Sequence, residues 1–395
     1  MQETDRKTAR DIFNDIPFPL KIVVVVGSLF IVFVIFYVSY MLLIYERPNK
    51  DTRVITISNS RTAAGLLDPS LTGDHDKRIL AYTIIEPLAD GSFSTEVLIS
   101  AGNNSCLLWS VLGGKIESRP DKLIGPDLVT PVAAGFWRAE TPSIVYDPAD
   151  TGREWKLFAY RYFWSGSIPL ARLYGVIVMR TADSPFSHNW SREEWLLSAS
   201  ETVPPEPYAN LVKNRLNALH PDLHDVYFYA RPSVVNVDNV LVMSLSAFVQ
   251  GKDSPDRIVM FASTDHARSW RYLGTPLHES DLANVDPSFI RLSGGSLFMK
   301  EEVMYLSIMA GTKDSDSVGA HVLEFENAAT AKLRRNKNTG AVAVVNYIKT
   351  LQNPPSRTGG GALAYSDVCP TKTFMSESLS GKRHDIFAHP NPPVK

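Results

Sequence analysis

The sequence predicts an all-β domain made of repeated sheets, which follows one long apolar segment near the N-terminus. Short runs rich in Val, Ile, Tyr, Phe and Leu are bounded by Gly, Pro, Asn and Asp, at the spacing of strands and tight turns. Residues 78–85, 155–163 and 256–264 are examples. Convincing helical periodicity is almost absent after residue 75. These observations favour strands throughout the larger part of the chain.

A repeated order of features predicts how the strands are grouped. Pro-Ser followed by two apolar residues occurs three times, and the first two occurrences lead to a strand that closes in Ser/Thr-x-Asp with a Trp after it. Arrays of similar β units are typical of β-propellers, and about 315 residues at roughly 60 to 65 per blade make five blades. A β-sandwich or jelly roll is the alternative, but neither predicts the repeat. The repeat begins at Pro142-Ser143, Pro232-Ser233 and Pro287-Ser288, and the closing turns contain Thr181, Asp183 and Trp190, and Ser263, Asp265 and Trp270.

Residues 22–44 form an apolar run without a charged side chain. As a helix with a rise of ~1.5 Å per residue, the run reaches ~34 Å, enough to cross a hydrocarbon core of ~30 Å. Tyr37, Tyr40 and Tyr45 end the run where a cleaved signal peptide has small residues. A buried core helix is the alternative, although such a helix normally has a polar face. We expect an uncleaved signal anchor in contact with the lipid bilayer.

The anchor divides the chain into four parts. Positive charges before the span slightly outnumber those that follow closely, so residues 1–21 are predicted to be a cytoplasmic tail. Residues 45–75 are polar and are predicted to be a stalk, and residues 76–395 are predicted to form the propeller. This single-pass arrangement places the C-terminal domain in the periplasm, in a lumen or outside the cell.

Composition disfavours one large class of partners. The net charge is −2, 44% of residues are hydrophobic, and charged residues of both signs are interspersed. Without a basic run that contains aromatic residues, we expect no nucleic-acid partner. His220 and His224 flank a proline in a predicted loop, and residues 357–361 lack the lysine of a phosphate-binding loop. Neither a metal nor another cofactor is predicted.

The repeat also predicts where a binding site lies. Innermost strands of a propeller start near one mouth of the central channel, so the residues just before each Pro-Ser are candidates to line it. Carboxylates, arginines and aromatic rings that converge from different blades suit a polar sugar. These candidates are Glu140 and Asp286 for catalysis, and Trp137, Arg138, Tyr229 and Arg231 for substrate binding.

Two resemblances accompany this pattern. Residues 263–270 resemble the Asp-box of sialidase-type propellers, Ser-x-Asp-x-Gly-x-Thr-Trp, with Ala267 in place of the glycine. Glu140-Thr141-Pro142 and Asp286-Pro287 resemble short stretches of five-bladed glycosidases of the arabinanase and fructosidase type, although their order along the chain is reversed. The resemblance implies that Glu140 is the general acid and Asp286 the base or nucleophile.

The two cysteines are far apart in the sequence. Cys106 falls in the predicted first blade and Cys369 in the last, which are neighbours in a closed ring. An oxidising compartment would allow a disulfide bond between them. Two unpaired buried cysteines are the alternative.

Together these features lead to a functional hypothesis. We expect a membrane-anchored glycoside hydrolase-like protein that acts on an envelope or extracellular glycan by a two-carboxylate mechanism. One alternative is a non-catalytic propeller that binds glycan or assembles with envelope proteins. Another is transferase or lyase activity on the same scaffold, because a fold does not fix a function.

Overall fold

The computed structural model describes the part of the chain that forms the β domain. The described residues are Val34, 52–58, 64–74, 77–88, 93–124, 131–199, 212–313, 319–348, 363–377, 383–390 and 393–394. The chain divides into two units, residues 1–50 and 51–395. Apart from Val34, the predicted anchor over residues 22–44 lies outside the described residues. Among the residues described, no helix has the length and apolar character needed to cross a membrane.

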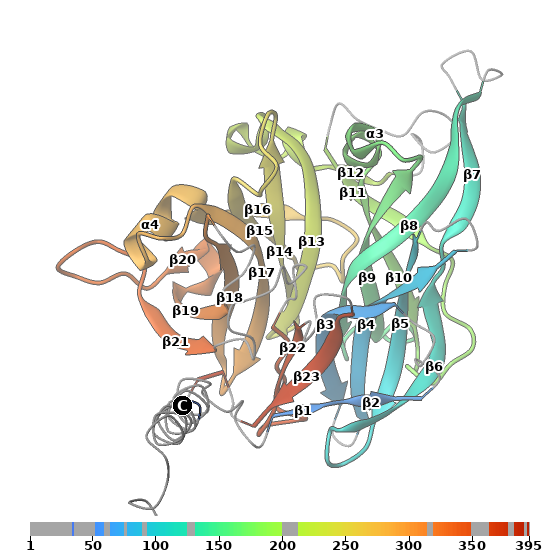
Figure 1. Ribbon diagram of the computed structural model, residues 1–395, viewed down its shortest axis with the longest axis horizontal. Coiled ribbons are helices and arrows are strands. Elements are labelled where there is room, and N and C mark those ends of the chain that lie inside the picture. Colours follow the sequence, from blue (N-terminus) through green and yellow to red (C-terminus); the bar gives the residue numbers. More distant parts are fainter. Residues whose placement is uncertain are drawn as a thin grey trace, which may run out of the picture. The chain divides into compact units, whose positions relative to one another are not determined.

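Five sheets, antiparallel except for the pairs β2–β6 and β11–β12, form the five blades of a β-propeller (Figure 1), which confirms the predicted propeller. The first blade contains β3 (Gly65–Asp74), β4 (Lys77–Pro87), β5 (Phe93–Gly102) and β6 (Leu108–Ile116), with β2 (Thr56–Ile57) at its outer edge. The second contains β8 (Pro131–Tyr146), β9 (Trp155–Trp164), β10 (Val176–Ala182), β11 (Glu194–Ser198) and β12 (Asn214–Arg215), and β7 (Arg119–Ile124) pairs with β8.

The remaining blades follow in chain order. The third contains β13 (Val226–Val237), β14 (Val240–Val249), β15 (Arg257–Ser263) and β16 (Arg271–His278). The fourth contains β17 (Arg291–Lys300), β18 (Val303–Gly311), β19 (Ala320–Asn327), β20 (Lys332–Leu333) and β21 (Val344–Ile348). The fifth contains β22 (Thr373–Glu377), β23 (Asp385–His389) and β1 (Arg53–Val54), and Ala364 forms a bridge to Phe374. Short helices α3 (Ile168–Leu173) and α4 (Leu282–Val285) lie in connections.

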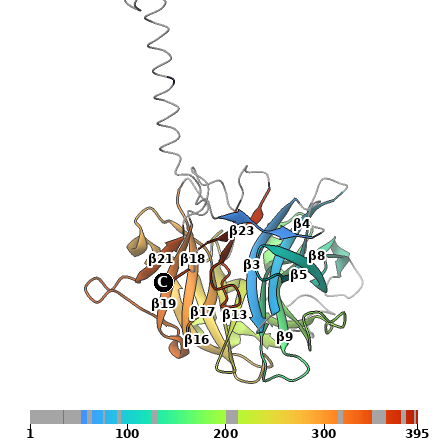
Figure 2. The ribbon, with the colours of Figure 1, turned by 90° about the horizontal axis from the view of Figure 1, so that it is seen from below.

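The ring closes by pairing the two ends of the domain. β1 is antiparallel to β23, with Arg53 opposite Ala388, and Figure 2 shows β23 between the fourth blade and β3 of the first. The stalk predicted over residues 45–75 is therefore wrong where β1, β2 and β3 lie, since these strands belong to the propeller. Although this segment is polar in composition, β3 pairs with β4 in a hairpin and buries Leu66 and Leu71.

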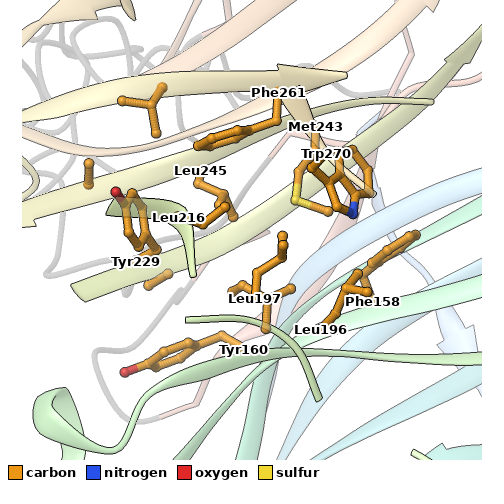
Figure 3. Packing of buried hydrophobic residues seen from close by; sticks show 14 of the residues in the cluster. Phe158, Tyr160, Leu196, Leu197, Leu216, Tyr229, Met243, Leu245, Phe261 and Trp270 are labelled. Carbon is orange, nitrogen blue, oxygen red and sulfur yellow. The ribbon is translucent and has the colours of Figure 1, made fainter. Parts of the chain in front are cut away.

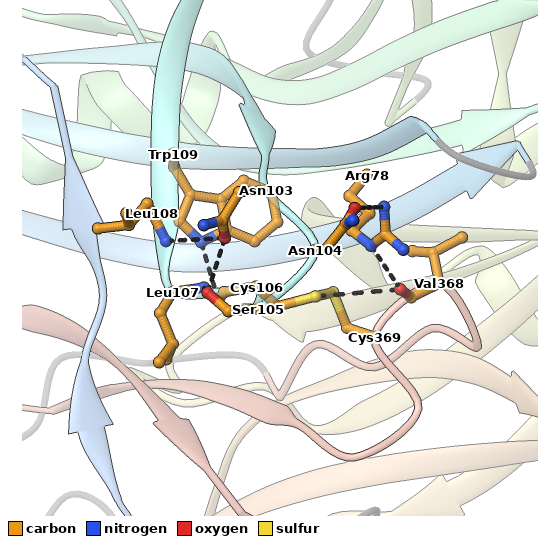
Figure 4. The surroundings of a disulfide bond; sticks show 10 residues. All are labelled: Arg78, Asn103, Asn104, Ser105, Cys106, Leu107, Leu108, Trp109, Val368 and Cys369. Atoms are coloured by element: carbon orange, nitrogen blue, oxygen red, sulfur yellow. Dashed lines mark hydrogen bonds between the residues drawn. A yellow bond between two sulfur atoms is a disulfide. The ribbon is translucent and has the colours of Figure 1, made fainter.

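A disulfide bond between Cys106 and Cys369 spans the same junction (Figure 4), with a Cα–Cα distance of 6.2 Å. Cys106 lies in the first blade between β5 and β6, and Cys369 precedes β22 in the fifth. The Arg78 Nε group donates to the Val368 carbonyl at 3.0 Å, beside the bond. The first and last blades are thus joined both covalently and by hydrogen bonds.

A serine in each of four innermost strands connects its blade to the next one. The Pro-Ser repeat is explained by this contact, because the serine hydroxyl satisfies a backbone group across the gap between blades. The contacts are Ile144 N–H to Ser70 Oγ (3.0 Å), Val234 N–H to Ser143 Oγ (2.8 Å), Leu297 N–H to Ser233 Oγ (2.8 Å) and Ser296 Oγ–H to the Leu363 carbonyl (2.7 Å).

Replacing Ser143 by alanine is expected to lower the free energy of unfolding by about 1 to 3 kcal/mol, because the buried Val234 N–H loses its acceptor. Chemical denaturation of the full-length chain measures the change. Ser105→Ala is the control, because that serine is exposed and bonds within its own turn. Equal stability of the two variants would contradict a role for Ser143 in joining blades.

Apolar side chains fill the spaces between neighbouring blades. Between the second and third blades, Phe158 and Leu196 face Met243 and Phe261 (Figure 3). Trp270, the last residue of the Asp-box, is 5% exposed and meets Phe158 edge to face at 6.3 Å. The box itself is closed by Asp265, which accepts from the Ser269 N–H at 2.9 Å. The motif therefore supports packing between blades.

Candidate functional site at the central channel

The innermost strands of four blades share a bulge at the same position. Pairing registers shift at Leu67/Ser70, Glu140/Ser143, Ala230/Ser233 and Leu292/Gly294. The bulged residues take positive φ, with values of 50° at Asp68, 50° at Thr141, 56° at Arg231 and 153° at Gly294. Such backbone strain is typical of functional sites, where a bulge redirects a side chain. All four bulged residues line one cavity of about 450 Å³ among the innermost strands.

Asp68 is the carboxylate that this bulge brings to the cavity from the first blade. Its side chain accepts a hydrogen bond from the Thr83 hydroxyl at 3.2 Å, and Thr83 in turn accepts from the Thr141 N–H at 3.0 Å. Burial raises the pKa of Asp68 to about 7; Arg231 opposes this rise and Glu140 adds to it. Asp68 is thus about half protonated at neutral pH.

Arg231 approaches the cavity from the third blade. A Cβ atom at Gly294 would lie 2.3 Å from its Nη1 atom, so the missing side chain of Gly294 makes room for the guanidinium. Burial lowers the pKa of Arg231, whereas Asp68 and Glu140 raise it. The guanidinium makes no hydrogen bond or ion pair with any of the residues that the structure describes.

Glu140 lies on β8 next to the bulge of the second blade. Its carboxylate accepts a hydrogen bond from the Tyr162 hydroxyl, which comes from β9. Burial, and after it the negative charge of Glu140, raises the pKa of Tyr162 above its usual range, so Tyr162 remains a phenol that can donate. Glu140 also raises the pKa of Tyr160 in addition to the effect of burial. Asp68, Glu140 and Arg231 therefore belong to one electrostatic cluster.

The structure brings together two of the six predicted site residues, Glu140 and Arg231. Trp137 is 0% exposed and donates from Nε1 to Asp121 at 2.9 Å, whereas Tyr229 is 3% exposed and donates to Asn217 at 2.8 Å. Both are core residues, because successive side chains of a strand point to opposite faces. Arg138 is 7% exposed and its guanidinium lies over Trp164, 5.1 Å from the ring centre.

Asp286 is not beside Glu140. It follows α4, on the outer side of the fourth blade (Figure 1), and accepts from the Ser288 N–H at 2.8 Å. The titratable group that acts on it electrostatically is His321 on β19, the third strand of the blade, and burial lowers the pKa of His321 to about 4. Pro287-Ser288 is not a blade start, because the innermost strand begins at Arg291 and its bulge and bridging serine are Gly294 and Ser296. The predicted third repeat is corrected accordingly.

Three residues of the cluster were missed in the sequence: Asp68, Thr83 and Tyr162. Asp68 does carry a signal, because Asp68-Pro69-Ser70 contains the repeated Pro-Ser. Only one apolar residue, Leu71, follows it before Thr72, so the stretch fails the stricter pattern. Thr83 and Tyr162 have no motif of their own and come from the second strands of their blades.

Replacing Asp68 by asparagine is expected to change how stability depends on pH. The folded-state pKa is raised, so between about pH 4 and 7 the folded state holds more protons than the unfolded state, and the wild type loses stability as the pH rises. From pH 5 to pH 8 this loss is on the order of 2 kcal/mol, and Asp68→Asn removes it. Urea unfolding at both pH values measures the effect. Asp286→Asn is the matched control, because hydrogen bonds from Ser288 lower the pKa of Asp286, so this carboxylate does not cause a loss of stability as the pH rises; the same slope in wild type and Asp68→Asn would contradict the expectation.

A second group of charged residues lies between the second and third blades. Asp147, Asp150 and His266 offer ligand atoms within 4.8 Å of one another, a spacing that suits a metal ion. The Lys156 ammonium lies 3.3 Å from Asp147 and 2.6 Å from Asp150, so a protein cation already neutralises these carboxylates. The group is an ion-pair network between blades.

Comparisons with known proteins agree with the architecture. No protein-family model and no curated protein matches the chain. Among solved structures, a GH32 beta-fructofuranosidase of Bombyx mori is similar, with a TM-score of 0.50 and 8% identity, over 86% of this chain and 62% of that one. The chain thus spans less than two thirds of that enzyme's length.

Two further solved structures cover most of both chains. A family 117 glycoside hydrolase of Zobellia galactanivorans has a TM-score of 0.47 and 10% identity, over 86% of this chain and 89% of that one. A GH43 enzyme of Xanthomonas citri, in complex with xylose, has a TM-score of 0.46 and 12% identity, over 86% and 90%. The likeness to the beta-fructofuranosidase shows a shared β-propeller fold.

Proposed function

We propose that the chain is a membrane-anchored, glycoside hydrolase-like protein that acts on an envelope or extracellular glycan. The observation that carries this proposal is the electrostatic cluster of Asp68, Glu140 and Arg231 on three successive innermost strands, of which Asp68 and Arg231 line the channel cavity. The propeller similar to that of the beta-fructofuranosidase supports a carbohydrate as the substrate class. Residues 22–44 supply the anchor, with residues 1–21 in the cytoplasm and the propeller outside it.

The catalytic pair in this proposal is Asp68 with Glu140, and Asp68 takes the place predicted for Asp286. A general acid must hold a proton at the working pH, and the pKa of Asp68, about 7, meets this requirement. Glu140 is held by a phenol that donates to it, which suits a carboxylate that acts as base or nucleophile. These assignments exchange the roles that the glycosidase resemblance implied for Glu140.

The chemical steps follow from these roles. Asp68 gives its proton to the glycosidic oxygen as the bond to the anomeric carbon breaks, and the leaving sugar departs as an alcohol. In one mechanism Glu140 removes a proton from a water molecule that attacks the anomeric carbon. In the other, Glu140 itself bonds to the anomeric carbon, and water later hydrolyses this bond and releases the sugar. Arg231 lies within electrostatic reach of both carboxylates and positions a polar substituent of the sugar.

One observation favours glycan binding without turnover as a second candidate. Asp68 is only 7% exposed, which leaves little of its carboxyl group open to a bound sugar. In that case the cavity holds a glycan and the carboxylates provide hydrogen-bond acceptors. Both candidates place carbohydrate at the same residues and differ only in whether a bond is broken.

The proposal is tested by incubating the full-length chain with a panel of oligosaccharides and measuring new reducing ends. Glu140→Gln and Asp68→Asn are each expected to lower turnover by about 10²- to 10⁴-fold. Asp286→Asn is the matched control and should retain the wild-type rate. Binding without turnover in every form supports the second candidate, and failure to bind any saccharide contradicts both.

A further inference from the structure

Two arginines near Glu140 lack carboxylate partners, and one of them, Arg231, lines the cavity. Arg138 is 7% exposed, its Nε atom has no hydrogen-bond partner, and neither it nor Arg231 forms an ion pair within the described part of the chain. Arg161 shows the usual arrangement, since it is 1% exposed and pairs with Glu193 at 3.1 Å. A buried cation without a partner is costly, because it has given up water without gaining a compensating charge.

Both guanidinium groups belong to the electrostatic cluster around Glu140. Arg138 lies two residues before Glu140 on β8, so the two side chains leave the same face of the strand. Arg138 lowers the pKa of Tyr162, against the larger effects of burial and Glu140, and the Tyr162 hydroxyl is bonded to Glu140. Arg231 acts on Asp68 and Glu140 from the third blade. Arg231 therefore acts on both carboxylates, and Arg138 acts on the tyrosine that is bonded to Glu140.

Among the described residues, neither guanidinium forms an ion pair with Asp68 or Glu140. Arg231 lines the cavity, where its guanidinium can be directed to a group that enters. Asp68 and Thr141 line the same cavity. A negatively charged group on the ligand would supply the anionic partner that the described part of the protein does not provide for these arginines.

We propose that the saccharide bound at this site is acidic, and that the planar carboxylate of a uronic acid pairs with Arg231 while Arg138 adds a second positive charge. This inference rests on the proposed carbohydrate function and specifies the substrate class of the same site. A guanidinium fork matches a carboxylate in two parallel hydrogen bonds, which a sugar hydroxyl cannot form. Gly294 contributes to this carboxylate-binding site because it leaves space for the Arg231 guanidinium.

The inference also sets the direction of a pH effect. The titratable and charged groups linked electrostatically in this cluster are Asp68, Glu140, Arg138, Arg231, Tyr160 and Tyr162, and Tyr146, Tyr365 and Asp367 also line the cavity. Asp68 loses its proton as the pH rises through about 7, and the new negative charge repels an acidic ligand. Affinity for a uronate should therefore be higher at pH 6 than at pH 8, and Asp68→Asn should remove the difference.

Calorimetric titration of the full-length chain tests the inference. The probes are oligosaccharides of galacturonate, glucuronate and mannuronate, each beside its neutral counterpart with the carboxyl group reduced to an alcohol. At least one uronate is expected to bind about 10- to 100-fold more tightly than its counterpart, with an advantage that shrinks at high salt. Arg231→Gln and Arg138→Gln should each reduce that advantage.

Two variants separate this effect from misfolding. Arg231→Lys keeps the charge and should restore part of the preference, whereas Gly294→Ala keeps every charge but displaces the guanidinium and should weaken it. Arg271→Gln, at an exposed position, is the matched control. Equal affinity for acidic and neutral sugars, or a uronate preference unchanged in Arg231→Gln, overturns the inference while the proposed function stands. Absence of binding to every saccharide overturns both.

Discussion

Replacing both Cys106 and Cys369 by serine lowers the free energy of unfolding by roughly 4 to 5 kcal/mol. The bond closes a loop of 263 residues, and the entropy that a cross-link removes from the unfolded chain grows with the logarithm of loop length. The ring depends on it further, because β1 contributes only two residues to its pairing with β23. Both cysteines are buried beside Trp109 and Phe374, so hydration of the replacement serines does not offset the lost stability.

Urea unfolding of the full-length chain measures this difference, and reduction of the wild type supplies the internal control. Wild type treated with a thiol reductant should match the double serine variant, while the variant itself should not respond to the reductant. A difference below about 1 kcal/mol would mean that strand pairing and packing close the ring by themselves.

Replacing Lys156 by methionine is expected to cost about 3 to 5 kcal/mol, the usual result of leaving buried carboxylates without their cation. Lys156 is 0% exposed, and its ammonium donates to Asp150 at 2.6 Å and to the Arg153 carbonyl at 2.8 Å. Among the described residues, the side chain of Asp147, also 0% exposed, would keep only its contact with His266 at 3.0 Å, whereas Asp150 would keep Arg268 at 3.0 Å. The substitution therefore isolates the charge of Asp147 at the junction of the second and third blades.

Lys115→Met is the matched control, because Lys115 pairs with Glu117 on an exposed part of the surface. Exposed ion pairs contribute at most about 1 kcal/mol, so this variant should unfold nearly as the wild type does. If Lys156→Met is no less stable than Lys115→Met, the buried network is not what holds these blades together.

The grouping of strands into blades was predictable from the sequence because a short contact repeats along the chain, and the number of blades followed from the length of the domain. Ser143 and Ser233 each accept a backbone N–H from the next blade, and that requirement fixes serine just after the bulge, within β8 and β13 and not at their first residues as predicted. Proline is optional there, since the position needs no donor, and Gly295-Ser296 makes the equivalent contact without it. The Pro-Ser pattern thus detected the innermost strands of two blades, missed Ser70 and Ser296, and wrongly included Ser288.

The site was predictable only in part, for a geometric reason. Which residues meet in the channel depends on the bulges, and a bulge shifts the alternation of side chains by one position. Trp137 and Arg138 were both predicted to line the channel, but adjacent residues of β8 cannot share a face, and Trp137 is in the core. Tyr162 reaches Glu140 through pairing of β8 with β9, which no local motif records.

The junction between the first and fifth blades also sets when the domain can finish folding. β1 is among the first residues of the propeller to be synthesised, and its partner β23 is among the last, so this pairing has a very large separation in sequence. Contacts of this kind slow folding, and they leave strand edges exposed until they form. The first blade therefore remains without its neighbour, the fifth blade, until most of the chain has been synthesised. The disulfide bond between Cys106 and Cys369 therefore forms only at the end of this process, when the two blades that it joins are already in place.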